Sequence, residues 1–107
     1  MTLAKGRCDY PVTIHPPDTI GDGSKDVASA GTAEKLVDDV TDCRLVNIYA
    51  KSGNTGNVFV GGATVSSSRG MVLEQARSSD WFPIDDLSKI YVDAANNGDG
   101  VQFSYVV

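Results

Sequence analysis

The fold class is decided by residues 89–107, KIYVDAANNGDGVQFSYVV. Apolar side chains recur at every second position on both sides of a central turn, which is the period of a half-buried β-strand. The turn, residues 96–100, reads Asn-Asn-Gly-Asp-Gly, and Gly and Asn tolerate the positive φ angles that tight turns require. We therefore predict a β-hairpin over residues 89–107.

A second hairpin is predicted over residues 44–61. Residues 44–51, RLVNIYAK, alternate in the same way, and residues 58–61, VFVG, supply a returning strand. Between them, residues 52–57 read SGNTGN, a run of turn-forming residues. The repetition of strand, turn and strand extends the β pattern over the middle of the chain.

Shorter strand-like runs occupy residues 71–74 and 81–84, and Pro83 in the second run favours the edge of a sheet. Strands at intervals of about 8–12 residues, joined by Gly, Asn and Ser turns, are typical of a sandwich or small barrel. We therefore predict an all-β fold, a small β-sandwich or jelly-roll-like barrel. The predicted core consists of the alternating apolar residues of the clearest strands: Val46, Ile48, Val58, Val60, Ile90, Val92, Val101 and Phe103.

The N-terminal third differs in composition, since prolines and glycines there disfavour a long helix or a central strand. We predict an extended N-terminal arm over residues 1–32 and a β-sandwich domain over residues 33–107. Residues 10–15, YPVTIH, alternate but contain a proline, so they fit an edge strand or an extended arm, with a loose tail as the alternative. The candidate interface residues of the arm are its alternating apolar side chains: Tyr10, Val12 and Ile14.

Trp81 and Phe82 complete the candidate interface. Because neighbouring residues of a strand point to opposite faces, these two rings must diverge, and one of them can be exposed to a partner. The alternative is that both are partly buried beneath a loop.

Charge and hydropathy exclude several classes of protein. The chain of 107 residues carries a net charge of −5, which argues against nucleic-acid binding. It contains no apolar run long enough for a transmembrane helix, and its first ten residues lack the apolar stretch of a signal peptide. We therefore expect no membrane partner and synthesis in a reducing cytoplasm. Unpaired thiols are then the expectation for Cys8 and Cys43, with a disulfide between them as the alternative.

No residue pattern points to catalysis, and we predict no enzymatic activity, no cofactor and no metal. His15 is the only histidine and precedes two prolines, which is a poor setting for a catalytic base. The two cysteines are far apart and lack zinc-ligand spacing, and no Gly-x-Ser-x-Gly nucleophile motif occurs. For Asp86 we predict a structural role, in which its carboxylate caps backbone N–H groups at a corner.

Three segments of residues 33–107 resemble small virion proteins of tailed bacteriophages, described as capsid decoration, cement or head-fibre-type proteins. The segments are residues 54–61, NTGNVFVG, residues 70–74, GMVLE, and residues 85–94, DDLSKIYVDA. The chain departs from this family at residues 75–78, QARS, where such proteins tend to have a Pro-Gly turn.

The resemblance implies a non-enzymatic virion structural protein. It would bind the outside of the phage capsid, contact the major capsid protein, and reinforce contacts between capsid subunits as a homotrimer at three-fold positions. The alternative is a receptor- or glycan-binding module of a phage tail or fibre, in which Trp81 or Tyr91 would stack on a ligand. A small enzyme is the third and least favoured class.

Overall fold

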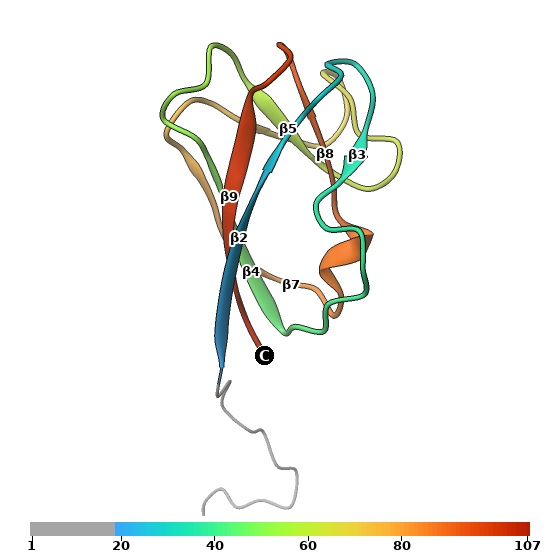
Figure 1. Cartoon of the computed structure of the whole chain (residues 1–107), viewed down its shortest axis with the longest axis vertical. Helices are drawn as coiled ribbons and strands as arrows, with labels where there is room; N and C mark the ends of the chain where they lie inside the picture. The colour runs from blue at the N-terminus through green and yellow to red at the C-terminus, as the bar shows by residue number, and fades with distance from the viewer. Residues whose placement is uncertain (1–18) are drawn as a thin grey trace, which may run out of the picture.

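The computed structural model describes residues 19–107. In it, two antiparallel sheets pack face to face (Figure 1). In the first sheet the strands lie in the order β2 (Ile20–Asp26), β9 (Gly100–Val106), β4 (Leu45–Ala50) and β7 (Ser78–Pro83). In the second sheet the order is β3 (Glu34–Lys35), β8 (Tyr91–Ala94), β5 (Val58–Gly61) and β6 (Met71–Leu73). A single 3-10 turn, η1 (Leu87–Lys89), precedes β8. The predicted all-β fold is confirmed, and within residues 19–107 no helix is long and apolar enough to cross a membrane.

The hydrophobic core lies between the two sheets and is supplied by alternate residues of their strands. In β4, for example, Val46, Ile48 and Ala50 are buried, while the residues between them are only half-buried. All eight residues of the predicted core are buried. In β4 and β9 the period of two separates the inner face from the outer face, whereas in β5 the intervening Phe59 is buried as well. Further core residues come from loops and from shorter strands: Val27, Leu36, Leu73 and Leu87.

Both predicted hairpins are wrong in their pairing. β4 bonds to β7 and β9, whereas β5 lies in the opposite sheet and bonds to β6 and β8. In the same way, β8 and β9 follow each other in the chain but lie in different sheets. Each turn therefore carries the chain across the sandwich, and the facing strands meet through side chains. A strand that crosses to the other sheet keeps the alternation of a strand that pairs, so periodicity does not distinguish the two connections.

The two crossing turns, residues 51–57 and 95–99, are tied to each other by a buried carboxylate. Asp99 accepts hydrogen bonds from the backbone N–H of Thr55 at 3.0 Å and of Gly56 at 2.9 Å. A carboxylate that receives two backbone donors offsets its loss of water. The two crossings therefore support each other at one end of the sandwich.

The predicted boundary of the N-terminal arm at residue 32 is wrong. β2 pairs with β9 over seven residues, from Ile20 opposite Val106 to Asp26 opposite Gly100, and the following Val27 is completely buried. Residues 20–26 thus belong to the sandwich. The glycines that argued against a strand serve the packing, because a Cβ on Gly23 would lie 2.5 Å from the ring of Phe103. Tyr10, Val12, Ile14, His15 and Cys8 lie outside the described residues.

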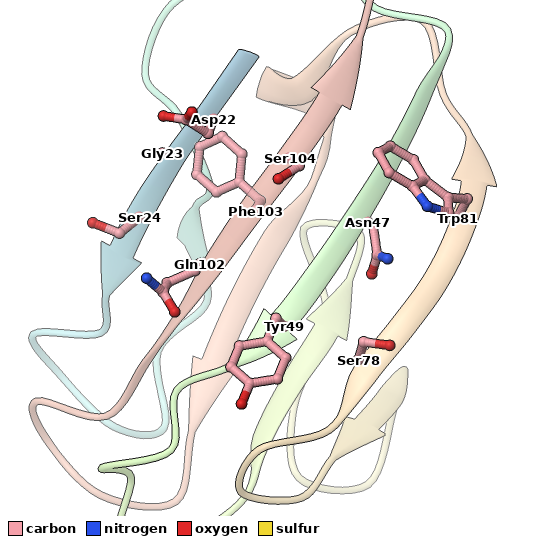
Figure 2. Close-up of a pocket in the computed structure, with 10 residues that line it drawn as sticks. All are labelled: Asp22, Gly23, Ser24, Asn47, Tyr49, Ser78, Trp81, Gln102, Phe103 and Ser104. Atoms are coloured by element: carbon pink, nitrogen blue, oxygen red, sulfur yellow. The ribbon is translucent and has the colours of Figure 1, made fainter. Parts of the chain in front are cut away.

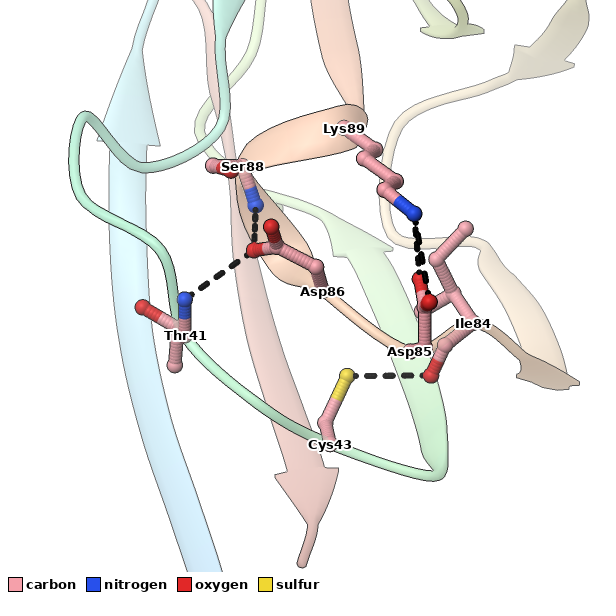
Figure 3. Close-up of polar contacts among 7 residues, drawn as sticks. All are labelled: Thr41, Cys43, Ile84, Asp85, Asp86, Ser88 and Lys89. Atoms are coloured by element: carbon pink, nitrogen blue, oxygen red, sulfur yellow. Dashed lines mark hydrogen bonds and ion pairs between the residues drawn. The ribbon is translucent and has the colours of Figure 1, made fainter.

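The corner before β8 is held by Asp86, as predicted (Figure 3). Its Oδ1 accepts hydrogen bonds from the backbone N–H groups of Thr41 at 3.0 Å and Ser88 at 2.9 Å. These donors hold the pKa of the Asp86 carboxyl below its ordinary value, because they favour the charged form. Nearby, the buried Cys43 thiol donates to the carbonyl of Ile84 at 3.2 Å, and its pKa is raised by burial and by the neighbouring carboxylates.

Candidate functional site

The outer face of the β2-β9-β4-β7 sheet carries a hollow of about 600 Å³ (Figure 2). It receives residues from all four strands, so it is a feature of the whole sheet and not of one loop. Most of its lining is polar and uncharged, with aromatic rings between the polar groups. The lining residues are Asp22, Gly23, Ser24, Asn47, Tyr49, Ser78, Trp81, Gln102, Phe103 and Ser104.

Strand register arranges eight of these side chains in two rows that cross the sheet. The first row is Trp81, Asn47, Ser104 and Asp22, and the second row is Ser78, Tyr49, Gln102 and Ser24. Neighbouring strands lie about 4.8 Å apart, so each row extends over about 14 Å. The rows offer hydroxyl, amide and aromatic groups to the same side of the sheet, which is the composition of a site for a polar ligand.

A β-bulge in β7 brings both Trp81 and Ser78 to this face. Trp81 lies opposite Asn47, and Ser78 lies opposite Tyr49. One residue of β4, Ile48, therefore faces two residues of β7, Ser79 and Asp80. In a regular strand, residues three apart point to opposite faces, and the extra residue corrects that mismatch. Without the bulge the hollow would lose one of its walls.

The backbone of the bulge is held in an uncommon conformation. Asp80 has a φ of 62°, in the left-handed region that residues other than glycine seldom adopt. Ser79 supports it, because its Oγ accepts a hydrogen bond from the N–H of Ile48 at 3.0 Å and donates one to the carbonyl of Asp80 at 2.8 Å. The Ser79 hydroxyl thus replaces the carbonyl that an unbroken strand would offer to Ile48. Unusual backbone of this kind is concentrated at functional sites, where it fixes the direction of a side chain.

Trp81 and Phe82 diverge as the sequence predicts. Trp81 is 46% exposed beside the hollow, while Phe82 lies opposite Val46 and packs against the core. Of this predicted pair, the structure therefore leaves Trp81 available for contact and places Phe82, half-buried, against the core. Figure 2 shows Asn47 between Trp81 and Ser78, with the ring of Tyr49 further along the same strand.

The chemistry of the hollow is that of hydrogen bonding. Among residues 19–107, Asp22 is its only charged lining side chain. The Oδ1 of Asn47 is buried and, alone among the buried side-chain oxygens and nitrogens of residues 19–107, has no hydrogen-bond partner. In the same part of the chain, no three His, Cys, Asp or Glu side chains lie close enough to hold a metal ion. The arrangement is suited to recognising a neutral polar molecule.

A second candidate surface is the apolar end of the same sheet. Ile20 is 68% exposed at the start of β2, and Val107 is exposed beside it. The two are joined through the backbone, because the N–H of Val107 donates to the carbonyl of Thr19 at 2.9 Å. Figure 1 shows the start of β2 and the C-terminus at the same end of the sandwich. We refer to Ile20 and Val107 together as the apolar end.

Sequence reasoning missed most of the hollow. Asn47, Tyr49 and Gln102 occupy the outward positions of two strands whose inward positions were identified correctly, so the same alternation could have found them. Trp81 and Ser78 could not be placed together in this way. Their odd separation predicts opposite faces unless a bulge is known.

Comparison of the chain with protein-family models, with curated proteins and with solved structures finds no match.

Proposed function

We propose that this chain is a non-enzymatic virion structural protein that binds the outside of a phage capsid and reinforces contacts between major capsid subunits. Two considerations support this proposal. The first is the resemblance, noted in the sequence, of three segments of residues 33–107 to small decoration and cement proteins of tailed phages. The second is the β-sandwich fold, the kind of building block that the resemblance implies. The proposed location is the capsid surface of the virion, after synthesis in the host cytoplasm.

The observation that carries the proposal is the exposure of Ile20 at the apolar end. Burying a side chain of this size against a partner contributes about 1.5–3 kcal/mol. β2 is also the outermost of the described strands of its sheet, and a partner strand can add to such an edge through backbone hydrogen bonds. A capsid subunit that contacts this edge would bury the apolar end at the same time.

The arm residues extend the same surface in sequence. Tyr10, Val12 and Ile14 precede β2 and are the apolar side chains nearest to Ile20 on its N-terminal side. Contacts from the arm and from the apolar end would reach more than one capsid subunit. Three copies around a three-fold axis would multiply these contacts, and simultaneous contacts slow dissociation far more than any single contact does.

Location on the particle is tested by immunogold electron microscopy. Antibodies raised against the purified protein are applied to virions of the phage that encodes it. Labelling distributed over the shell is the expected result. Labelling confined to the tail or fibres would contradict the capsid assignment and support the alternative of a tail or fibre module.

The role of the apolar end is tested by co-sedimentation with undecorated shells. Ile20→Asp is expected to lower occupancy on the shells because it places a charge in the proposed contact. Val72→Asp is the matched control, since Val72 is also an exposed aliphatic strand residue but lies on β6 of the other sheet. Equal occupancy of the two variants would exclude Ile20 from the contact. Light scattering of the purified protein tests the trimer independently.

A further inference from the structure

We propose that the hollow on the β2-β9-β4-β7 sheet is a binding site for a neutral saccharide, with the indole of Trp81 as the stacking platform. The site is separate from the apolar end that the capsid proposal uses, and it holds wherever on the particle the protein is located. Four features of the hollow support this proposal: the exposed indole of Trp81, the two rows of polar side chains, the low charge of the lining and the rigidity of the strands that carry it.

The aromatic contribution comes from Trp81. The face of an aromatic ring carries partial negative charge, and it attracts the weakly positive C–H groups on one side of a pyranose ring. Trp81 is half-exposed at the end of a polar row, so part of the indole is free for such a contact. An indole that served only the core would be covered, as the Phe103 ring is at 6% exposure.

The polar contribution comes from the two rows. Amide side chains both donate and accept hydrogen bonds, as sugar hydroxyls do, and the hollow has one amide in each row, Asn47 and Gln102. The Oδ1 of Asn47 lacks a partner, which is unfavourable for a buried oxygen. A rotation of the Asn47 side chain toward the hollow would bring this oxygen within reach of a saccharide hydroxyl, which is a small donor that can satisfy it. The length of the rows, about 14 Å, accommodates a short run of linked sugar rings.

Charge and polarity favour a neutral saccharide over other ligands. Asp22 is the only charged residue in the described part of the lining, and the chain as a whole carries a net charge of −5. Polyanions such as nucleic acids or sulfated glycans would be repelled. Lipids and apolar peptides would leave the hydroxyl and amide groups of both rows without partners.

The site is stiff before any ligand arrives. Its residues stand on hydrogen-bonded strands, and the Ser79 hydroxyl fixes the bulge that directs Trp81. A site that is already in its binding conformation loses less conformational freedom on association. This offsets the weakness of individual contacts to an uncharged, well-hydrated ligand.

The experiment uses the full-length protein on an array of neutral and anionic microbial oligosaccharides. The neutral oligosaccharide that binds best is then titrated in solution while tryptophan fluorescence is recorded. Trp81 is the only tryptophan of the chain, so its emission reports directly on the hollow. We expect a saturable change in emission, and binding at least about tenfold weaker for Trp81→Ala as measured by calorimetry.

Two further variants make the test specific. Gln102→Ala removes an exposed amide from the second row and is expected to weaken binding several-fold without affecting the fold. Tyr91→Ala is the matched control, because Tyr91 is a half-buried aromatic residue on β8 of the opposite sheet. We expect this variant to bind the oligosaccharide with the same affinity as the wild type. Thermal melts followed by circular dichroism verify that each variant is folded.

Several results would overturn the saccharide site. They are the absence of any neutral binder on the array, binding restricted to anionic glycans, and equal affinities for Trp81→Ala, Gln102→Ala and the wild type. Loss of shell binding by Trp81→Ala without any saccharide binding would instead identify the hollow as a protein contact. None of these results depends on whether Ile20 contacts the capsid, so the two proposals fail separately.

Discussion

The side chain of Asn54 forms two hydrogen bonds with the backbone of Gly100. Its Nδ2 donates to the Gly100 carbonyl and its Oδ1 accepts from the Gly100 N–H, both at 2.9 Å. Asn54 lies in the turn that follows β4, and Gly100 is the first residue of β9. The side chain therefore connects the turn between β4 and β5 to the start of β9. Asn54 is only 5% exposed, and its amide forms with Gly100 the same two hydrogen bonds that a paired strand residue would form.

Replacing this amide should destabilise the fold. Asn54→Ala leaves the buried N–H of Gly100 without a partner, and we expect the free energy of unfolding to fall by about 1–3 kcal/mol. Asn96→Ala is the control, because its side chain makes an exposed hydrogen bond to Thr55 and should change stability by less than about 0.5 kcal/mol. Urea denaturation measures both. Equal midpoints for the two variants would show that the Asn54 amide is not important for stability.

A methyl group at Gly23 should disturb the packing of β2 on β9. The Cβ of Gly23→Ala would lie 2.5 Å from the Phe103 ring, which is buried in the core and has little room to move. Overpacking of this kind costs about 1–3 kcal/mol. Gly53→Ala is the control, because nothing lies within 4 Å of its Cβ position. The melting temperature should fall for the first variant and stay close to wild type for the second.

The Asp86 corner should make stability depend on pH on the acid side. The pKa of Asp86 is lowered in the folded protein, so its contribution is complete above the ordinary pKa of an aspartate and is lost as the pH falls below about 4. We therefore expect the difference in urea midpoint between wild type and Asp86→Asn to be largest near neutral pH and to shrink towards zero in acid.

Asp85→Asn serves as the control for that measurement. Asp85 is the adjacent carboxylate, and it forms an exposed ion pair with Lys89 at 2.9 Å. Such a pair contributes little to stability. If the midpoint of Asp86→Asn stayed a constant distance below wild type at every pH, titration of Asp86 would have no part in acid unfolding.

Two truncations should separate the arm from the sandwich. Removing residues 1–18 leaves β2 intact, and we expect the melting temperature to stay near that of the full chain. Removing residues 1–32 deletes β2 and the fully buried Val27, and it exposes the edge of β9. An uncovered strand edge favours aggregation, so the shorter protein should unfold or precipitate. A well-folded product of the longer deletion would contradict the role of β2 in the sheet.

Side-chain alternation predicted which residues are buried but not which strands are neighbours. Val46, Ile48, Val92 and Val101 were placed in the core correctly, because alternation reports the inner face of any strand in a two-layer structure. Pairing depends on whether a turn reverses the chain within a sheet or carries it to the other layer. That choice is made here by tertiary contacts such as those of Asp99, which join residues more than 40 positions apart and leave no local pattern.

For the hollow, too, the sequence predicts the face on which a residue lies but not which residues of different positions come together. Divergence of Trp81 and Phe82 follows from their adjacency in a strand and was predicted. The position of Trp81 relative to Ser78 depends on the bulge at Asp80, where a residue other than glycine adopts positive φ. Aspartate tolerates this conformation, but it is also common in regular turns and caps, so Asp80 alone does not identify a bulge in the sequence.

The central place of β9 governs the order in which the chain can fold during synthesis. β9 lies between β2 and β4, and it pairs residue 20 with residue 106. On a ribosome, β2 therefore emerges before β9 and must wait, with this partner not yet made, until residues 100–106 have been translated. Non-local pairing of this kind slows folding and lengthens the time during which strand edges are uncovered. We expect refolding to be slow for a protein of this size, and nascent chains that end before residue 100 to depend on chaperones for solubility.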